Sequence, residues 1–373
     1  MAGNPLRELE RFGQSFWLDY IQRDLLNSDE FRRLLEDDGL KGMTSNPTIF
    51  DKAISRSNHY DRQLEEMARK GKGADDIYDA LVFEDIRMAA DALRQLYDQS
   101  SGRSGYISCE VSPLLAHDTD ATIAEARRIF AALDRPNLMV KVPGTPEGIP
   151  AIEQLTAEGR NINVTLMFSM RHYETVAEAF IRGLEKRAQK GLPLDRVASV
   201  ASVFVSRIDT LVDKRLDEQI PAASDQGIAA LRGKAGIANI KLIYQRFKEY
   251  FYGQRFKPLV EKGARAQRPL WGSTGTKNPA YSDVMYVDNL IGPDTINTIP
   301  PATIDAFRDH GKPRCSIEEG LNDAYEAVRR LAGLEIDLNA VGDQLQREGV
   351  DAFAQSYKQL LGHIEERRAS LMA

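Results

Sequence analysis

Short β-rich runs alternate with amphipathic helical stretches along most of the chain, and this alternation limits the possible folds more than any other feature. Several runs are apolar at both odd and even positions, which is typical of strands covered by helices on one side and by packed side chains on the other. The order of elements therefore predicts an α/β protein built as a (β/α)8 TIM barrel, with a doubly wound open sheet as the second choice. The eight runs that predict strands are Ser15–Tyr20, Leu40–Thr44, Tyr106–Val111, Leu138–Pro143, Ile162–Phe168, Val197–Val205, Pro269–Thr274 and Val284–Val287.

Apolar residues at helical spacing predict the helices between these strands. The clearest stripes lie at Ile77–Leu96, Ile123–Leu133, Tyr173–Leu184 and Ile237–Phe251. Such helices supply the outer layer that a barrel needs.

Two regions are longer than a minimal barrel requires. Residues 208–267 form a helical excursion with a charged middle, and residues 313–373 add further helices. Tail helices of this kind usually cover a barrel rather than form a unit of their own. We therefore expect residues 1–373 to form one domain, with both helical regions packed on the barrel.

The composition argues against some classes of function. The chain has 373 residues and a net charge of −6, with acidic and basic residues interspersed. Nucleic-acid binding requires a basic surface, whereas a few lysines and arginines in one cleft suffice for a small anionic substrate. The N-terminus has no apolar signal segment, and no stretch approaches the length of a membrane span. Together with only two cysteines, which suit a reducing compartment, these features predict a cytoplasmic protein.

Lys141 is the first candidate for chemistry. In a barrel the reactive groups lie at the C-terminal ends of the strands, and Lys141 lies in the apolar run Leu138–Pro143. A lysine in such a run is either at the solvated edge of a sheet or buried for chemistry, and a closed barrel has no edge. Burial disfavours the ammonium form, and the neutral amine is the nucleophile that attacks a carbonyl.

Other predicted strands carry polar residues on one face. Glu110 is the last but one residue of the run Tyr106–Val111, and Asp19 has the same position in Ser15–Tyr20. Asn163 and Thr165 share a face because successive side chains of a strand alternate. Each of these residues, taken singly, can be a structural group satisfied by hydrogen bonds. An acid, a lysine, an amide and a hydroxyl in successive strands of one barrel instead indicate a catalytic site.

Candidates for anion binding follow the later strands. Ser202 and Arg207 lie at and just after the end of the sixth run. The loop 272–279 is rich in glycine and hydroxyls and contains Ser273 and Lys277. Such a loop suits a phosphate monoester, although similar loops are also common turns. No metal-ligand spacing and no G-x-G-x-x-G motif after a strand is found, so we expect neither a metal nor another cofactor.

Two motifs resemble those of the transaldolase family. The segment Gly42–Thr48 (GMTSNPT) is similar to the family's first signature, and Val140–Thr145 (VKVPGT) is similar to the segment that carries its Schiff-base lysine. The phrase Trp271–Pro279 resembles the longer bacterial members, although Lys277 stands where many shorter relatives use an arginine. The resemblance extends from about residue 16 to about residue 303. It implies a (β/α)8 barrel of the class I aldolase type.

The resemblance also implies roles for the candidate residues. Lys141 would form the Schiff base, and Asp19 would remove the proton of the substrate's C4 hydroxyl. Glu110 would move protons through a water held near Thr165. Phe204 would place an apolar ring near the intermediate and favour transfer over hydrolytic release. The substrate-binding residues implied are Asn46, Asn163, Ser202, Phe204, Arg207, Ser273 and Lys277, with the last three at the phosphate.

The implied activity is that of a transaldolase of the non-oxidative pentose phosphate pathway. Such an enzyme moves a dihydroxyacetone unit from sedoheptulose 7-phosphate to glyceraldehyde 3-phosphate and gives erythrose 4-phosphate and fructose 6-phosphate. The expected partners are therefore small-molecule sugar phosphates, with no nucleic acid and no membrane, and the chain can be a monomer or a homodimer. Two alternatives stay open: a fructose 6-phosphate aldolase-like lyase that releases dihydroxyacetone, and a non-catalytic paralogue that acts as a binding protein. Phe204 and the chain length argue against the first, and the intact polar set argues against the second.

Overall fold

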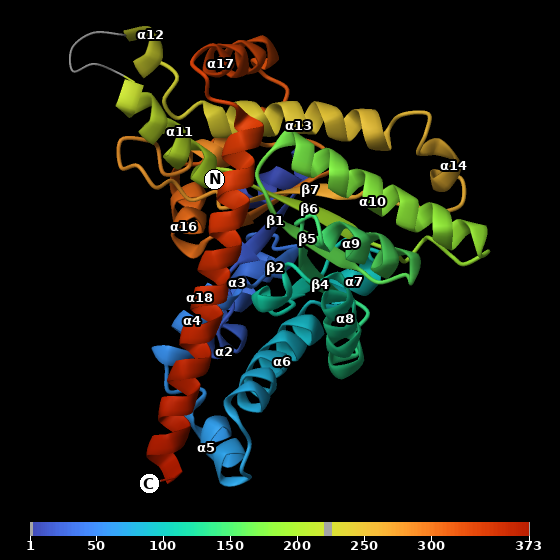
Figure 1. Ribbon diagram of the computed structural model, residues 1–373, viewed down its shortest axis with the longest axis vertical. Coiled ribbons are helices and arrows are strands. Elements are labelled where there is room, and N and C mark those ends of the chain that lie inside the picture. Colours follow the sequence, from blue (N-terminus) through green and yellow to red (C-terminus); the bar gives the residue numbers. More distant parts are fainter. Residues whose placement is uncertain (1–2, 220–225, 373) are drawn as a thin grey trace.

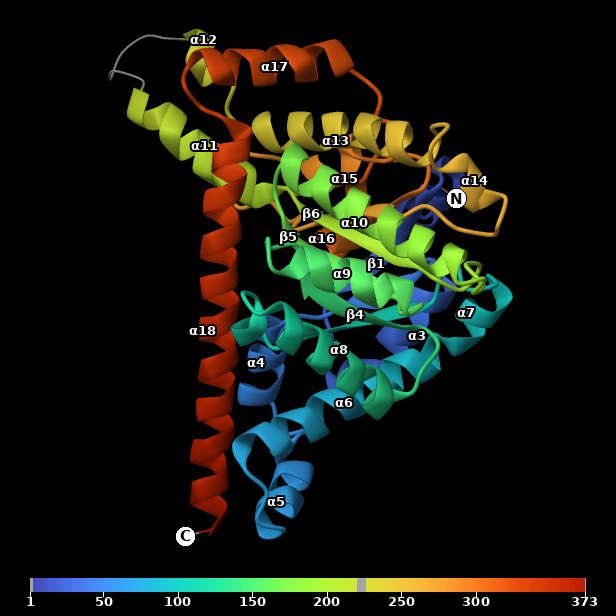
Figure 2. The same cartoon turned by 45° about the vertical axis from the view of Figure 1, so that its right-hand side comes forward.

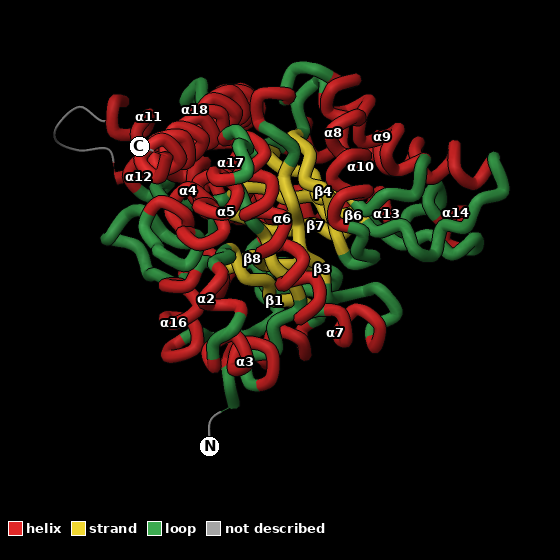
Figure 3. Tube along the Cα trace, turned by 90° about the horizontal axis from the view of Figure 1, so that it is seen from below, coloured by secondary structure: helices red, strands yellow, loops and turns green. Residues whose placement is uncertain are grey.

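The computed structural model describes residues 3–219 and 226–372, and its strands form one closed barrel in chain order (Figure 1). All neighbours are parallel, and the last strand pairs with the first. Helices surround the barrel (Figure 3). The predicted (β/α)8 TIM barrel is confirmed, and the open-sheet alternative is wrong. The strands are β1 (Gln14–Asp19), β2 (Gly42–Thr44), β3 (Tyr106–Glu110), β4 (Leu138–Pro143), β5 (Ile162–Met167), β6 (Ser199–Phe204), β7 (Arg268–Gly272) and β8 (Thr295–Ile299).

The sequence prediction of the eighth strand is wrong. The run Val284–Val287 leads into the short helix α15 (Met285–Asn289), and the strand is β8 instead. A short apolar run does not distinguish a strand from a buried helical turn. β8 contains three polar residues and only two isoleucines, so it does not form the apolar run that marks the other strands in the sequence. Neighbours satisfy part of this polar set: Thr274 Oγ1 donates to Asn297 Oδ1 at 2.9 Å. Asn297 Nδ2 has no hydrogen-bond partner among the described residues.

The helices before β6 are α1 (Pro5–Glu8), α2 (Arg23–Leu26), α3 (Asp29–Glu36), α4 (Pro47–Ser55), α5 (Asp61–Arg69), α6 (Ala74–Ala92), α7 (Arg94–Gln99), α8 (Thr119–Leu133), α9 (Gly148–Ala157) and α10 (Met170–Gln189), with short 3-10 helices at Leu9–Phe12 and Pro113–Leu115. Of the three stripes predicted before β6, those at 123–133 and 173–184 lie in α8 and α10. The stripe expected over residues 77–96 spans two helices, because α6 ends and α7 begins around Leu93. The other helices of this region were not predicted as stripes.

In the residues that the structure describes, the two regions expected to exceed a minimal barrel consist mainly of helices. After β6 come α11 (Ser206–Gln219), α12 (Gln226–Ala229), α13 (Ala235–Phe251) and α14 (Lys257–Val260); after β8 come α16 (Pro301–His310), α17 (Leu321–Gly333) and α18 (Leu338–Met372). Helix α17 packs beside α13. Helix α18, with 35 residues, runs along one side of the molecule and packs on α4, α5 and α6 (Figures 1 and 2). In the described part of the chain, no helix is long and apolar enough to cross a membrane.

The barrel interior below the C-terminal ends of the strands is filled with apolar side chains. Trp17, Met139, Leu270 and Ile296 are buried there in one cluster. The indole of Trp17 lies over Gly42 of β2, where an added Cβ would come within 2.5 Å of the ring, so only glycine fits. This packed layer leaves the C-terminal ends of the strands as the place for polar groups.

Candidate active site

A cavity of about 390 Å³ opens at the C-terminal ends of the barrel strands. The residues proposed from the sequence that line it are Asp19, Asn46, Lys141, Ser202, Phe204, Arg207, Ser273 and Lys277. The others do not line the cavity: Glu110 lies on β3, and Asn163 and Thr165 lie on β5. These two strands flank β4, which carries Lys141. The structure therefore brings the whole proposed set to one end of the barrel.

Lys141 is held by its neighbours in the register. Glu110 pairs with it on one side and Asn163 on the other. Only 5% of the lysine side chain is exposed, and its Nζ lies 3.4 Å from Oε2 of Glu110. Nζ also donates to the backbone oxygen of Ser45 at 3.2 Å. These contacts fix the amine at the wall of the cavity.

Two buried carboxyl groups lie near this lysine. Burial raises the pKa of Glu110, and the Lys141 ammonium opposes the shift. Burial also raises the pKa of Asp19, opposed first by Lys141 and then by the hydrogen bond that Thr44 Oγ1 donates at 2.7 Å. A carboxyl with a raised pKa can hold a proton closer to neutral pH and give it to a reacting oxygen.

Asn163 is the centre of a hydrogen-bonded chain that joins three strands. Ser202 Oγ donates to Asn163 Oδ1 at 2.7 Å, and Asn163 Nδ2 donates to Ser108 Oγ at 2.9 Å. All three side chains are buried. Because both ends of the amide are engaged, the orientation of Asn163 is fixed.

Thr165 is a buried hydroxyl next to β4. Its Oγ1 has no hydrogen-bond partner among the described residues. Directly after it, Leu166 has a φ of +58°, and the pairing of β5 with β6 shifts register between Val164 and Met167. Unpaired buried hydroxyls and strained backbone are costly, and both are concentrated at functional positions.

Asn46 has a structural contact as well as a place in the cavity wall. It is the N-cap of α4, where its Oδ1 accepts from the backbone N–H of Ile49 at 3.0 Å. Pro47 at the first helical position favours this helix start. The cap fixes the Asn46 side chain, and its amide nitrogen keeps two donors for a ligand.

Arg207 lies between two aromatic rings. Its Cζ is 5.4 Å from the ring centre of Phe204 and 5.9 Å from that of Phe353. Burial lowers the pKa of Arg207, while Asp19 and Glu348 oppose the shift. In residues 3–219 and 226–372 no hydrogen bond or ion pair engages the guanidinium, so its donors are available to an anion.

The loop after β7 adds further groups to the same wall. Ser273 has a φ of +55°, and its Oγ shares a hydrogen bond of 2.8 Å with Ser206 Oγ at the start of α11. Lys277 lines the cavity from the same loop. A guanidinium, a hydroxyl and an ammonium after neighbouring strands are the groups that a phosphate monoester requires.

Several residues that line the cavity were missed by the sequence analysis: Tyr20, Thr44, Lys52, Thr298 and Phe353. Thr44 had a signal, since it belongs to the GMTSNPT segment, and its Oγ1 contacts both Asp19 and Thr298 at 2.7 Å. Thr298 lies on the strand that was placed wrongly. Phe353 comes from α18, and no local pattern distinguishes it from other apolar residues of that helix.

These features together define a class of protein. A buried lysine, carboxyls with raised pKa values and anion-binding groups at the mouth of a parallel barrel are typical of enzymes that use an amine as nucleophile. No group of three or more His, Cys, Asp or Glu in the described part of the chain is arranged to hold a metal ion.

Comparison with known proteins agrees with this class. The model of the transaldolase/fructose-6-phosphate aldolase family matches residues 16–364, and the chain belongs to that family. It is 46% identical over 377 residues to Transaldolase 2 of Nostoc punctiforme, with 98% of each chain covered. It is 45% identical over 373 residues to the transaldolase of Trichodesmium erythraeum, again with 98% of each covered. The transaldolase of Thiobacillus denitrificans is 46% identical over 361 residues, which cover 97% of this chain and 99% of the relative.

Proposed function

We propose that this chain is a transaldolase that carries a dihydroxyacetone unit on Lys141. The donor is sedoheptulose 7-phosphate and the acceptor is glyceraldehyde 3-phosphate, with erythrose 4-phosphate and fructose 6-phosphate as products of the non-oxidative pentose phosphate pathway. The observation that carries the proposal is the buried Lys141 amine, 3.4 Å from Glu110, in the wall of a cavity that also contains Arg207. The full-length similarity to transaldolases supports it.

The reaction begins when the ammonium of Lys141 passes a proton to Glu110, and the resulting amine attacks C2 of the ketose to form a carbinolamine. Glu110 gives a proton to the departing hydroxyl, so that water leaves and an iminium remains. The raised pKa of Glu110 supports this role, because a protonated carboxyl is the acid that the step needs. The unpaired Oγ1 of Thr165 supports its role in holding the water that relays the proton.

Cleavage of the C3–C4 bond follows. Asp19 takes the proton of the C4 hydroxyl, the C4 oxygen forms the aldehyde, and the bonding electrons move into the iminium. The aldose phosphate leaves, and an enamine of dihydroxyacetone remains on Lys141. The same steps in reverse join the enamine to the acceptor aldehyde and release the new ketose.

The remaining residues bind the substrate. Asn46 and Asn163 hydrogen-bond the hydroxyls of the dihydroxyacetone fragment, and the fixed amide of Asn163 supports such a role. Ser202 orients Asn163 and lines the cavity. Arg207, with Ser273 and Lys277, binds the phosphate of donor and acceptor, so binding energy remote from the reacting bond positions it.

The same proposal covers the organisation of the protein. We propose that the described residues act as one catalytic domain, with small-molecule sugar phosphates as its partners in the cytoplasm. It would act as a monomer or as a homodimer.

Borohydride reduction in the presence of fructose 6-phosphate tests the mechanism. Reduction converts the iminium into a stable amine, and peptide mass mapping should place a dihydroxyacetone-derived adduct on Lys141. Release of most of the fragment as free dihydroxyacetone, even with erythrose 4-phosphate present, would favour the lyase alternative. Absence of an adduct, or an adduct on another lysine, would reject the Schiff base on Lys141 and favour the binding-protein alternative.

A further inference from the structure

Helix α18 packs across the end of the barrel that holds the cavity. Larger residues of α18 that are buried against the rest of the molecule recur at helical spacing, among them Val341, Leu345, Gln346, Val350, Phe353, Tyr357, Leu360 and Ile364. Only Phe353 among them lines the cavity. A helix that begins nearly two hundred residues after β4 in the sequence thus completes the wall around Lys141.

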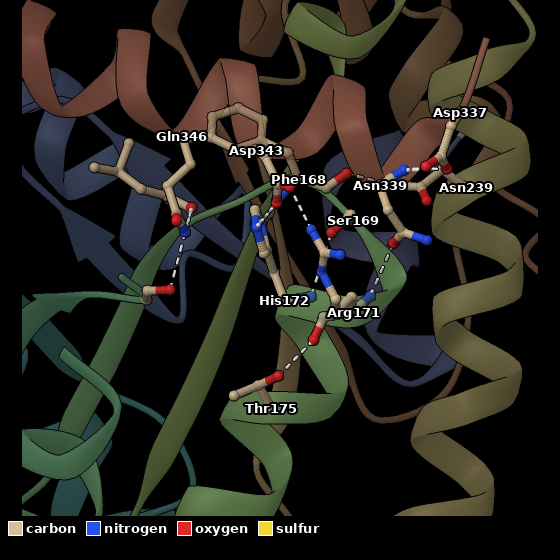
Figure 4. Close-up of polar contacts among 12 residues, drawn as sticks. Phe168, Ser169, Arg171, His172, Thr175, Asn239, Asp337, Asn339, Asp343 and Gln346 are labelled. Carbon is tan, nitrogen blue, oxygen red and sulfur yellow. Dashed lines mark hydrogen bonds and ion pairs between the residues drawn. The ribbon is translucent and has the colours of Figure 1, made fainter. Parts of the chain in front are cut away.

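The first turns of α18 are tied to the strand ends by polar contacts (Figure 4). Gln346 Nε2 donates to the backbone oxygens of Gly144 and Leu166, each at 2.9 Å. The Gly144 oxygen comes directly after β4, and the Leu166 oxygen lies in the bulge of β5. Asp343 contacts His172 Nε2 at 3.1 Å and pairs with Arg171. The helix is therefore fixed relative to the strands that carry Lys141 and Thr165.

A glycine allows α18 to approach the site closely. A Cβ on Gly349 would lie 2.9 Å from Leu166 Cδ2 and 3.6 Å from Arg207 Nη1. A methyl group at this position would require the end of the Leu166 side chain to move. Gly349 is one helical turn before Phe353, so the close approach sets the position of that ring.

The ring of Phe353 faces two cationic groups of the site. Its centre is 5.9 Å from Lys141 Nζ and 5.9 Å from Arg207 Cζ. The side chain is nearly fully buried, with the residue 4% exposed. An aromatic face near a cation is attractive and holds the guanidinium of Arg207 between Phe353 and Phe204.

We propose that Phe353 is a further residue of the active site, which closes the cavity over Lys141 and Arg207 and keeps the enamine from water. This inference rests on the proposed function. Loss of the fragment by hydrolysis requires a proton on C3 of the enamine, which gives the iminium, and then addition of one water to C2. The resulting carbinolamine expels the lysine nitrogen, which takes the hydroxyl proton, and free dihydroxyacetone leaves. A ring that limits the access of water to the enamine slows this branch, whereas the C–C bond to the acceptor aldehyde forms without added water. The water that later releases the new ketose is the one proposed to lie near Thr165.

The test compares Phe353→Ala and Phe353→Leu with the wild-type full-length enzyme. Fructose 6-phosphate and erythrose 4-phosphate are supplied together, and free dihydroxyacetone and sedoheptulose 7-phosphate are both quantified. Phe353→Ala should raise the ratio of free dihydroxyacetone to transfer product several-fold. It should also raise KM for fructose 6-phosphate, because Arg207 loses one of its two rings. Phe353→Leu, which keeps most of the apolar volume, should give a ratio between those of Phe353→Ala and wild type.

Tyr357→Leu is the matched control. Tyr357 lies one turn further along the same helix, is buried, and packs edge-on against Tyr78 with ring centres 5.1 Å apart. It does not line the cavity. This variant should keep the wild-type ratio even if it lowers the melting temperature. An equal change of the ratio in Tyr357→Leu would overturn the inference, since loosening of α18 alone would then explain the effect.

The inference and the proposed function fail in different ways. A wild-type enzyme that neither transfers the fragment nor traps it on Lys141 would reject the proposed function. Normal wild-type transfer with an unchanged ratio and KM in both Phe353 variants would reject only the role of Phe353. If Phe353→Ala does not fold, Phe353→Leu is compared with Tyr357→Leu. A higher ratio of free dihydroxyacetone to transfer product in Phe353→Leu would support the inference, and equal ratios would overturn it.

Discussion

Met139 and Lys141 lie on the same strand, on the same face and two residues apart, yet they belong to two different levels of the barrel interior. Met139 is part of the apolar cluster around Trp17, whereas Lys141 lines the cavity. The lower level can pack densely and stabilise the fold. In the upper level, charged groups are buried, and hydrogen bonds and ion pairs offset only part of the cost of removing them from water. Such an arrangement favours reactivity over stability. On β4, a separation of two residues thus divides a position that packs the core from the position for which we propose chemistry.

The largest effect on turnover is expected for Lys141→Ala, which removes the proposed nucleophile from the upper level. Turnover should fall to background, because the amine that attacks the carbonyl is gone. The free energy of unfolding should stay equal or rise, since Glu110 can take up a proton once the buried ammonium is removed. A coupled transfer assay and urea unfolding measure the two quantities. Wild-type turnover in this variant would reject the whole assignment of function.

Met139→Ala is the corresponding change in the lower level. We expect a loss of about 2–5 kcal/mol in the free energy of unfolding, because a buried methionine leaves a cavity in a packed cluster. The kcat of the folded enzyme should stay close to that of the wild type, because Met139 does not line the cavity. Chemical denaturation and activity per folded molecule check both statements. A large loss of kcat with unchanged stability would show that the two levels are not separate.

Arg207→Ala removes an anion-binding group from the upper level without touching the nucleophile. KM for phosphorylated substrates should rise about ten- to hundredfold with little change in kcat, since a hydrogen bond to a charged group contributes about 1.5–3 kcal/mol. Arg215→Ala is the control: Arg215 lies two turns along the same helix, bonds to Gln344 of α18 and is not in the cavity wall. Unchanged KM in Arg207→Ala would remove the phosphate role of this residue and leave the Schiff base intact.

The elements and residues that form the two levels could not all be predicted equally well from the sequence. The barrel could be predicted because each strand-helix unit has a local pattern, and β8 was missed because its Asn297 and Thr298 are paired only by the folded neighbours. Asp19 and Lys141 could be found because a charged residue in an apolar run is conspicuous in the sequence. Phe353 could not be found, since an apolar residue in an amphipathic helix carries no sign of where that helix packs.

The proposed roles of Glu110, Asn163 and Thr165 depend on more than the strand pattern. The period of two residues indicates that they face inward, but not that Asn163 bonds to Ser108 and Ser202. It also does not indicate that Thr165 lacks a partner among the described residues. These properties arise from the register of neighbouring strands and from the bulge at Leu166, which long-range packing determines.

The smallest effect is expected at Asp209. Its carboxyl has a shifted pKa but does not line the catalytic cavity, so it tests whether a shifted pKa alone indicates a catalytic role. Burial raises its pKa to about 7, although the N–H of Gly236 and the hydroxyl of Tyr286 donate to it at 2.7 and 2.8 Å. The unfolded group has the ordinary pKa of 3.8. Between pH 3.8 and about 7 the folded chain therefore binds a proton that the unfolded chain has released, and this contribution to stability is lost as the pH rises through that window.

Asp209→Asn should remove this pH dependence and leave kcat unchanged. Relative to wild type, the variant should gain stability between pH 5 and pH 8 in urea unfolding, because it has no proton to lose. A constant difference between the two proteins across that range would mean that Asp209 is already ionised at pH 5. A fall in kcat would instead mean that a residue of α11 outside the cavity contributes to catalysis. The expected result, a strongly shifted carboxyl without catalytic effect, would show that position at a strand end, rather than a raised pKa, distinguishes Asp19 and Glu110.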